Sequence, residues 1–165
     1  MTGQYSYCSG EGNLRSSGSL RGNFPFQFSA SRDSLLVLFR DLMGRKSLFL
    51  LIDSLDIRGW NLIEQQPVSL RQILTRNPFL NYFSPGDLVT LFWGIPPVVQ
   101  VTNVTAGPPL DFTVQFEETA VGRFVRSAVI SDDQNRYELT FQTRTLGQRN
   151  EYLFTRITGR IPWDR

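Results

Sequence analysis

The stretch from Phe83 to Pro97 constrains the fold most, because it is a short apolar helix whose two ends are both marked. Ser84 can cap the N-terminus, and Gly94 followed closely by prolines ends the helix. Between these signals Thr90 is the only polar residue, and the rest of the circumference is covered by five large apolar side chains: Leu88, Val89, Leu91, Phe92 and Trp93. A helix that is apolar on all sides cannot lie with one face in water. We therefore expect it to be enclosed, either as a core helix packed on a sheet or as a lid over an apolar pocket.

Most of the remaining chain is patterned as strands. Residues 24–30 alternate cleanly, with phenylalanines on one face and mainly polar side chains on the other. Residues 69–77 form a second short helix that opens with a capping box, in which Ser69 is followed by Gln72. The expected strands are 13–21, 24–30, 34–40, 47–52, 56–62, 98–102, 110–116, 122–131, 136–144 and 152–159.

About ten strands interrupted once by two short helices predict a mainly β fold. We expect a curved antiparallel sheet, or incomplete β-barrel, with the two helices covering its open face. The chain of 165 residues suits one domain, which we place at residues 13–165 after an unstructured segment 1–12.

Charge and absent residue types exclude several function classes. Lys plus Arg number 17 against 15 Asp plus Glu, so no nucleic-acid partner is expected. Without histidine, and with Cys8 as the single cysteine, the chain offers no common catalytic triad and no metal site, and we expect no cofactor and no enzyme. The adjacent acidic pairs Glu117–Glu118 and Asp132–Asp133 suit solvated turns better than carboxylate catalysis.

No segment is long and apolar enough to span a membrane, since the longest apolar run covers only residues 48–52. The polar, unpatterned start is what remains when a signal peptide has been removed, which favours an envelope location.

Thirteen phenylalanines and three tryptophans would line the concave face of such a sheet, as an open cavity or as a filled core. Arg126 lies at alternate positions with Ala128 and Ile130, so the three side chains share one face of the expected strand. An inward charge needs a partner, so Arg126 either hydrogen-bonds to the lid or points outward.

Three segments resemble the outer-membrane lipoprotein receptor LolB family over most of the chain. Residues 34–44, SLLVLFRDLMG, are similar to a strand that ends in an apolar residue plus Gly, with the next strand at 48–52. Residues 84–96 resemble that family's lid helix with its apolar-Gly-apolar-Pro ending. Residues 139–141, 153–157 and Trp163 are similar to its closing strands and terminal Trp.

This resemblance implies a monomeric, periplasmic half-barrel at the inner leaflet of the outer membrane. It would receive lipid or lipoprotein acyl chains from a periplasmic carrier protein and release them into the outer membrane. The membrane contact falls on Met43, with Leu42 beside it, although both side chains could instead fold back onto the sheet. Tyr7 before Cys8 does not suit lipoprotein processing. The expected cavity residues are Phe26, Phe28, Phe49, Leu51, Leu88, Phe92, Trp93, Phe112, Val114 and Phe116.

Three function classes therefore stay open. A lipid carrier requires an apolar cavity, a structural or assembly protein of the envelope requires a filled barrel, and a carboxylate enzyme requires two acids that converge in a pocket.

Overall fold

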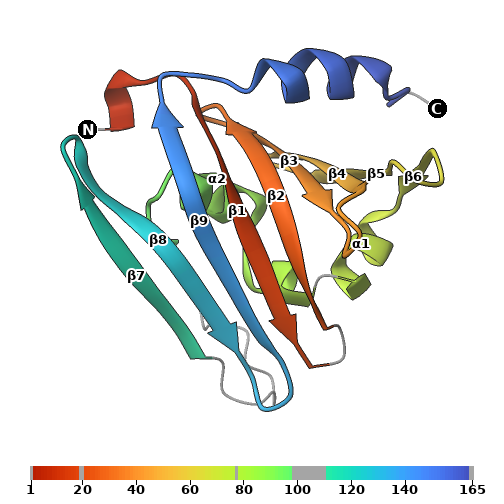
Figure 1. Ribbon diagram of the computed structural model, residues 1–165, viewed down its shortest axis with the longest axis horizontal. Helices are drawn as coiled ribbons and strands as arrows, with labels where there is room; N and C mark the ends of the chain where they lie inside the picture. Colours follow the sequence, from red (N-terminus) through yellow and green to blue (C-terminus); the bar gives the residue numbers. More distant parts are fainter. Residues whose placement is uncertain (1, 19–20, 77, 98–110, 164–165) are drawn as a thin grey trace.

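A computed structural model describes residues 2–18, 21–76, 78–97 and 111–163. Its strands form one antiparallel sheet in the order β6-β5-β4-β3-β2-β1-β9-β8-β7. The sheet is curved and unclosed, with β6 and β7 at its two ends (Figure 1). The predicted mainly β, incomplete barrel is thus confirmed, with nine strands in the described part of the chain. They are β1 (Cys8–Ser17), β2 (Gly22–Ala30), β3 (Ser34–Arg40), β4 (Lys46–Asp53), β5 (Ile57–Asn61), β6 (Gln66–Val68), β7 (Asp111–Thr119), β8 (Gly122–Ser131) and β9 (Arg136–Leu146).

Helical segments cover both faces of this sheet. The concave face holds α1 (Leu70–Arg76), η2 (Pro78–Tyr82) and α2 (Pro85–Phe92). Figure 1 shows α2 behind β9 and β1, and α1 to the right of β2. The opposite face carries the C-terminal helix, which consists of η4 (Tyr152–Ile157) and η5 (Thr158–Arg160). A short 3-10 turn, η1 (Thr2–Gln4), precedes β1. Among the described residues no helix has the length and apolar character needed to cross a bilayer.

Coverage on both faces explains why β3 is continuously apolar. Leu35 and Val37 belong to the concave core, whereas Leu36 and Leu38 pack with the C-terminal helix. A strand buried on both faces has no polar side and therefore no alternation.

Two expectations about secondary structure are wrong. Residues 152–159 form a helix in place of a strand, because the side chains that pack on the sheet are Leu153, Ile157 and Ile161, four residues apart. The segment 1–12 is not unstructured, since β1 begins at Cys8 and pairs with both β2 and β9. The strand expected at 98–102 lies outside the described residues.

Candidate functional site

The helix α2 is enclosed, as its sequence predicts. Its N-terminus has a capping box in which the Asp87 amide donates to Ser84 Oγ (3.1 Å) and the Ser84 amide donates to Asp87 Oδ2 (3.2 Å). The five large apolar side chains at positions 88, 89 and 91–93 are each 5% exposed or less. The helix therefore contributes all of its apolar circumference to the interior of the half-barrel.

Aromatic rings fill the space between α2 and the sheet. Phe92 from α2 lies 5.5 Å from Phe26, 5.1 Å from Phe28 and 5.2 Å from Phe141, measured between ring centroids. The same three strand rings also contact one another, and all four are at most 4% exposed. In this closed arrangement the interior of the half-barrel is filled by Phe92 of α2 itself.

Two glycines of β1 make room for these rings. Gly10 is paired with Phe28, and Gly12 is paired with Phe26. A Cβ added at Gly12 would lie 2.4 Å from Phe26 Cζ, and one added at Gly10 would lie 2.9 Å from Phe28 Cε1. These glycines allow close approach of aromatic side chains to the backbone of β1.

The C-terminal end of α2 is inserted between two strands that separate. β8 and β9 pair from Ser127 to Ser131 on β8, and beyond Ser127 each continues without pairing to the other. There the Val125 amide donates to Gly94 O (2.7 Å), where a sheet partner would otherwise accept. Gly94 has a φ of +90°, which ends the helix in the left-handed region that glycine adopts without strain.

Arg144 on β9 joins the end of α2 to the separated strands. Its Nε donates to Phe92 O (3.1 Å) and its Nη1 donates to Val125 O (2.9 Å). On the other side of the helix end, Trp93 Nε1 donates to Ser31 O (2.7 Å) in the turn between β2 and β3. We call the contacts of Arg144 and Trp93 the latch of α2.

The environment of Arg144 is apolar for a cation. Its side chain is 4% exposed, and the guanidinium lies 4.3 Å from the Phe141 ring centroid. Glu117 Oε1 lies 3.8 Å from Nη1, at the outer limit of an ion pair. Burial lowers the pKa of Arg144, and within the described residues its Nη2 is buried with no hydrogen-bond partner. The latch thus includes a cation with one unused donor group.

Of the two positions that the sequence left open for Arg126, the structure shows the outward one, and the arginine bonded to the lid is Arg144. Arg126 is exposed, while Val125 and Ala128 face the concave core. The pairing with β7 passes from Ser127 directly to Val125, so Arg126 is an extra residue in β8. Such a β-bulge interrupts the alternation of side chains, and Arg126 therefore points outward.

A second β-bulge turns Arg144 inward. The pairing with β1 passes from Thr143 to Phe141, so Gln142 is the extra residue in β9. Simple alternation from Phe141 would place Arg144 on the outer face. After the bulge, Arg144 and Leu146 share the side of the concave core.

The other expected cavity residues divide among three places. Phe26, Phe28, Leu88, Phe92 and Trp93 lie in the concave core. Phe112, Val114 and Phe116 are half-buried on β7, the last strand of the sheet, and pack against that core.

Phe49 and Leu51 are wrongly assigned. Both lie on the opposite face, where Phe49 is 6.1 Å from the Trp163 ring. Their neighbours Leu50 and Ile52 face α2 instead. The run 48–52 is apolar at every position, so its pattern could not select a face.

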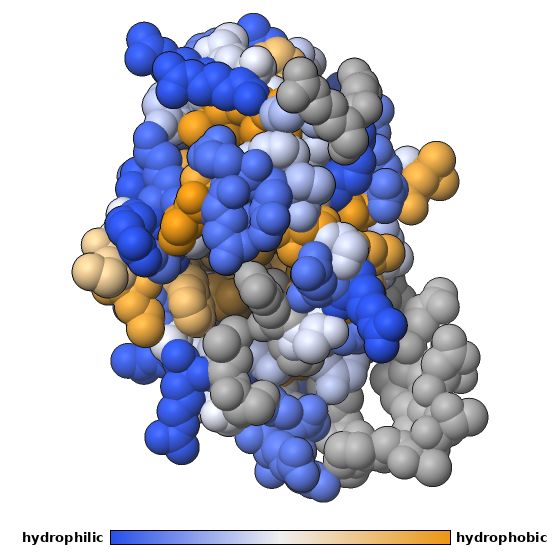
Figure 2. Space-filling model, turned by 90° about the vertical axis from the view of Figure 1, so that its right-hand side faces the viewer, coloured by the Kyte–Doolittle hydropathy of each residue, from blue (hydrophilic) through white to orange (hydrophobic). Residues whose placement is uncertain are grey.

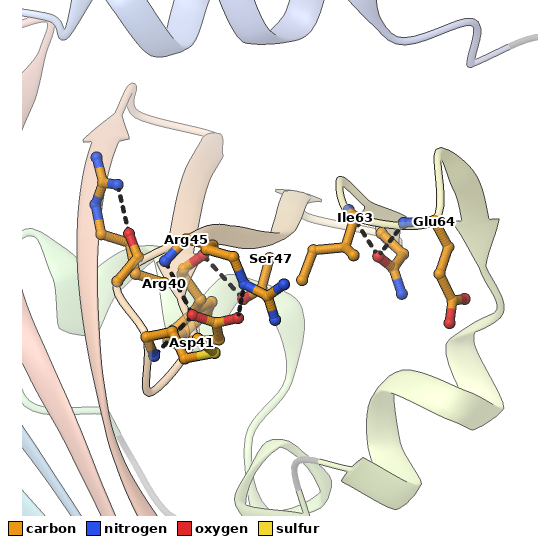
Figure 3. Close-up of polar contacts among 10 residues, drawn as sticks. Arg40, Asp41, Arg45, Ser47, Ile63 and Glu64 are labelled. Atoms are coloured by element: carbon orange, nitrogen blue, oxygen red, sulfur yellow. Dashed lines mark hydrogen bonds and ion pairs between the residues drawn. The ribbon is translucent and has the colours of Figure 1, made fainter.

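The turn between β3 and β4 presents Leu42 and Met43 to solvent. Their exposed fractions are 68% and 79%, so neither side chain folds back onto the sheet. Asp41 Oδ1 accepts hydrogen bonds from the amides of Met43 and Arg45, and Arg45 Nε donates to Asp41 Oδ2 (2.8 Å), as Figure 3 shows. These contacts hold the turn in one shape with both apolar side chains outward.

Cys8 and the two acidic pairs lie in separate places. Cys8 is fully buried on β1, and burial raises the pKa of its thiol to about 12. Asp132 Oδ1 accepts from the amides of Gln134 and Asn135 in the turn after β8. Glu117 lies at the other end of the β7–β8 hairpin, so the two acidic pairs do not converge.

The arrangement of the sheet and its helices matches a known fold. The chain is similar to the crystal structure of a LolA superfamily protein from Nitrosomonas europaea, with a TM-score of 0.52 and 13% sequence identity. The similarity covers 92% of this chain and 90% of that one, so it extends over the whole half-barrel. No protein-family model and no curated protein matches the sequence. The fold is thus that of the LolA superfamily protein.

Proposed function

We propose that this protein binds the acyl chains of a lipid or lipoprotein beneath α2 and passes them to the outer membrane. The observation that supports it most is the helix α2, whose large apolar side chains are all buried against a concave aromatic face and whose end is held by the latch. The fold of a LolA superfamily protein supports the same function, and so does the resemblance of residues 34–44 and 84–96 to segments of the LolB receptors. The site of action would then be the periplasm, at the inner leaflet of the outer membrane, with a periplasmic lipoprotein carrier as donor.

Binding requires α2 to move, because Phe92 already occupies the interior. An acyl chain that replaces this ring gains about 0.8 kcal/mol for each methylene removed from water. Opening breaks the latch, whose hydrogen bonds contribute on the order of 1 kcal/mol each, somewhat more for those from a charged donor. The burial of roughly ten methylenes therefore exceeds the free energy of the latch hydrogen bonds.

Release would use the turn of Leu42 and Met43. Two exposed apolar side chains on a turn of fixed shape gain free energy when they enter a bilayer interface. This contact would place the half-barrel against the membrane that receives the acyl chains.

A titration with a fluorescent long-chain fatty acid tests acyl binding. We expect saturable binding at one site, and we expect Phe28→Trp, which enlarges a ring in the filled interior, to weaken it. A variant with the same change on the opposite face, Phe49→Trp, is the control, because Phe49 lies in the apolar cluster under the C-terminal helix. Absence of saturable binding by the parent protein would refute the proposal.

Met43→Asp tests the membrane contact. We expect a change in unfolding free energy within about 0.5 kcal/mol, since the side chain is exposed, and a clear loss of liposome association. Leu55→Asp is the matched control. Leu55 is 91% exposed in the β4–β5 turn, at the end of β4 that lies away from Met43. Equal liposome binding by the Met43→Asp variant and its parent would contradict this role.

The filled interior favours a second candidate, a non-enzymatic structural or assembly protein of the envelope. Close contacts among Phe26, Phe28, Phe92 and Phe141 are what a permanent core would show. The fatty-acid titration separates the two candidates, since a permanent core gives no saturable signal.

A further inference from the structure

A hollow of about 240 Å³ lies on the face opposite to α2, between β4, β5 and the C-terminal helix. We call it the outer hollow. Its apolar lining includes Trp60, Ile157 and Ile161, which are each at most 7% exposed. Figure 2 views the molecule from the side of β6 and the C-terminal helix, and shows apolar side chains between strongly hydrophilic ones on this side. The proposed acyl site beneath α2 does not use this hollow.

The polar lining of the outer hollow is positive. Lys46 comes from the start of β4 and Arg160 from η5, and no lining residue is acidic. Lys46 Nζ lies 4.5 Å from the ring centroid of Tyr152, another lining residue. Within the described residues neither Lys46 nor Arg160 forms an ion pair with a carboxylate. Two cations beside an apolar floor, without a neutralising acid, are complementary to an anionic amphiphile.

The outer hollow lies beside the β3–β4 and β5–β6 turns, which expose apolar side chains. The Leu62 amide donates to Ser47 O (2.9 Å), which fixes the β5–β6 turn beside the β3–β4 turn. Ile63 follows Leu62 in the first turn, and Ser47 is the second residue of β4, directly after the second turn; Figure 3 draws both. Ile63 is 47% exposed, and Lys46 directly follows the turn that presents Met43. A molecule that contacts a bilayer through these turns brings the outer hollow to the depth of the lipid headgroups.

We propose that the outer hollow binds the phosphate headgroup of an anionic phospholipid. Lys46 and Arg160 contact the phosphate, and the floor around Trp60 contacts the glycerol and the first methylenes. This proposal goes beyond acyl transfer, because it concerns the opposite face of the sheet and does not require α2 to open.

Calorimetric titration of the whole chain with dihexanoyl phosphatidylglycerol, below its critical micelle concentration, tests the proposal. We expect saturable binding that dihexanoyl phosphatidylcholine, whose headgroup has no net charge, does not reproduce. Lys46→Gln combined with Arg160→Gln should weaken it about tenfold, as expected for the loss of two partly exposed charge contacts. The control combines Arg71→Gln with Arg156→Gln, which removes two exposed charges outside the outer hollow and should leave the affinity unchanged.

Three results would overturn the proposal. They are equal binding of the two phospholipids, equal weakening by the control pair, and full competition by inorganic phosphate at concentrations comparable to those of the lipid, which would indicate a site for a free anion. The comparison of phospholipids uses the parent protein and does not depend on the folding of a variant. Fatty-acid binding beneath α2 should be the same in all these proteins, so failure of one proposal can be told from failure of the other.

Discussion

The two faces of the sheet are covered in different ways. On the convex face the C-terminal helix packs through Leu153, Ile157 and Ile161 onto side chains of β3, β4 and β5. On the concave face α2 packs through a larger apolar surface, and its end is additionally held by Arg144 and Trp93. A buried cation is thus part of the concave cover. The cations over the rings of the C-terminal segment are less buried: Lys46 beside Tyr152 is half-buried, and Arg58 beside Trp163 is exposed.

This difference indicates different roles for the two covers, which are α2 on the concave face and the C-terminal helix on the convex face. Apolar packing alone is non-directional and is lost only as the covered surface becomes wet. A buried arginine bonded to backbone carbonyls loses these bonds when α2 moves, and its charge then requires another partner or water. We therefore expect α2 to be the cover that opens and the C-terminal helix to be the one that stays.

Trp93→Ala should have the largest effect on stability. The side chain is 5% exposed and its indole is hydrogen-bonded, so its removal should lower the unfolding free energy by about 3 to 5 kcal/mol. Chemical denaturation measures this. A loss below about 1 kcal/mol would mean that α2 contributes little to the closed state.

Leu153→Ala should destabilise the convex cover by about 2 to 5 kcal/mol, because Leu153 is fully buried against the sheet. Hydrogen exchange should then increase first in the C-terminal helix and not in α2. Simultaneous opening of both helices would contradict the independence of the two covers.

Arg144→Met should remove the latch while keeping an apolar side chain of similar length. Leaving Phe92 O and Val125 O without their donor should cost about 1 to 3 kcal/mol, and amides of α2 should exchange faster than those of the C-terminal helix. Arg126→Met is the control and should change stability by less than about 0.5 kcal/mol, since Arg126 is exposed. If both variants behave alike, Arg144 is not a latch.

The smallest effect concerns Cys8 beneath the concave cover. Because burial raises the pKa of its thiol to about 12, the folded protein keeps the proton above pH 9 while the unfolded chain releases it. Stability should therefore fall as the pH rises above about 9, with a contribution from Cys8 of about 1 kcal/mol at pH 10. Denaturation at pH 8 and pH 10 measures the loss, and Cys8→Ala should reduce it. An identical pH dependence in the variant would show that the thiol does not contribute.

The sequence by itself determined the elements whose signals are local. The capping box at Ser69, the N-terminal cap at Ser84, the helix end at Gly94 and the alternation of β2 all predicted the observed structure, because each depends on residues a few positions apart. The circumference of α2 likewise determined that this helix is enclosed.

Tertiary structure alone decided which side chains meet. The β-bulges at Arg126 and Gln142 depend on pairing between distant strands, and they exchange the roles of Arg126 and Arg144. The face taken by Phe49 and the helical form of residues 152–159 depend on a second cover that only the folded chain assembles. The apolar run 48–52 is compatible with either face of the sheet, and the mixed segment 152–159 is compatible with a strand or a helix. Packing against the rest of the sheet selects one structure for each.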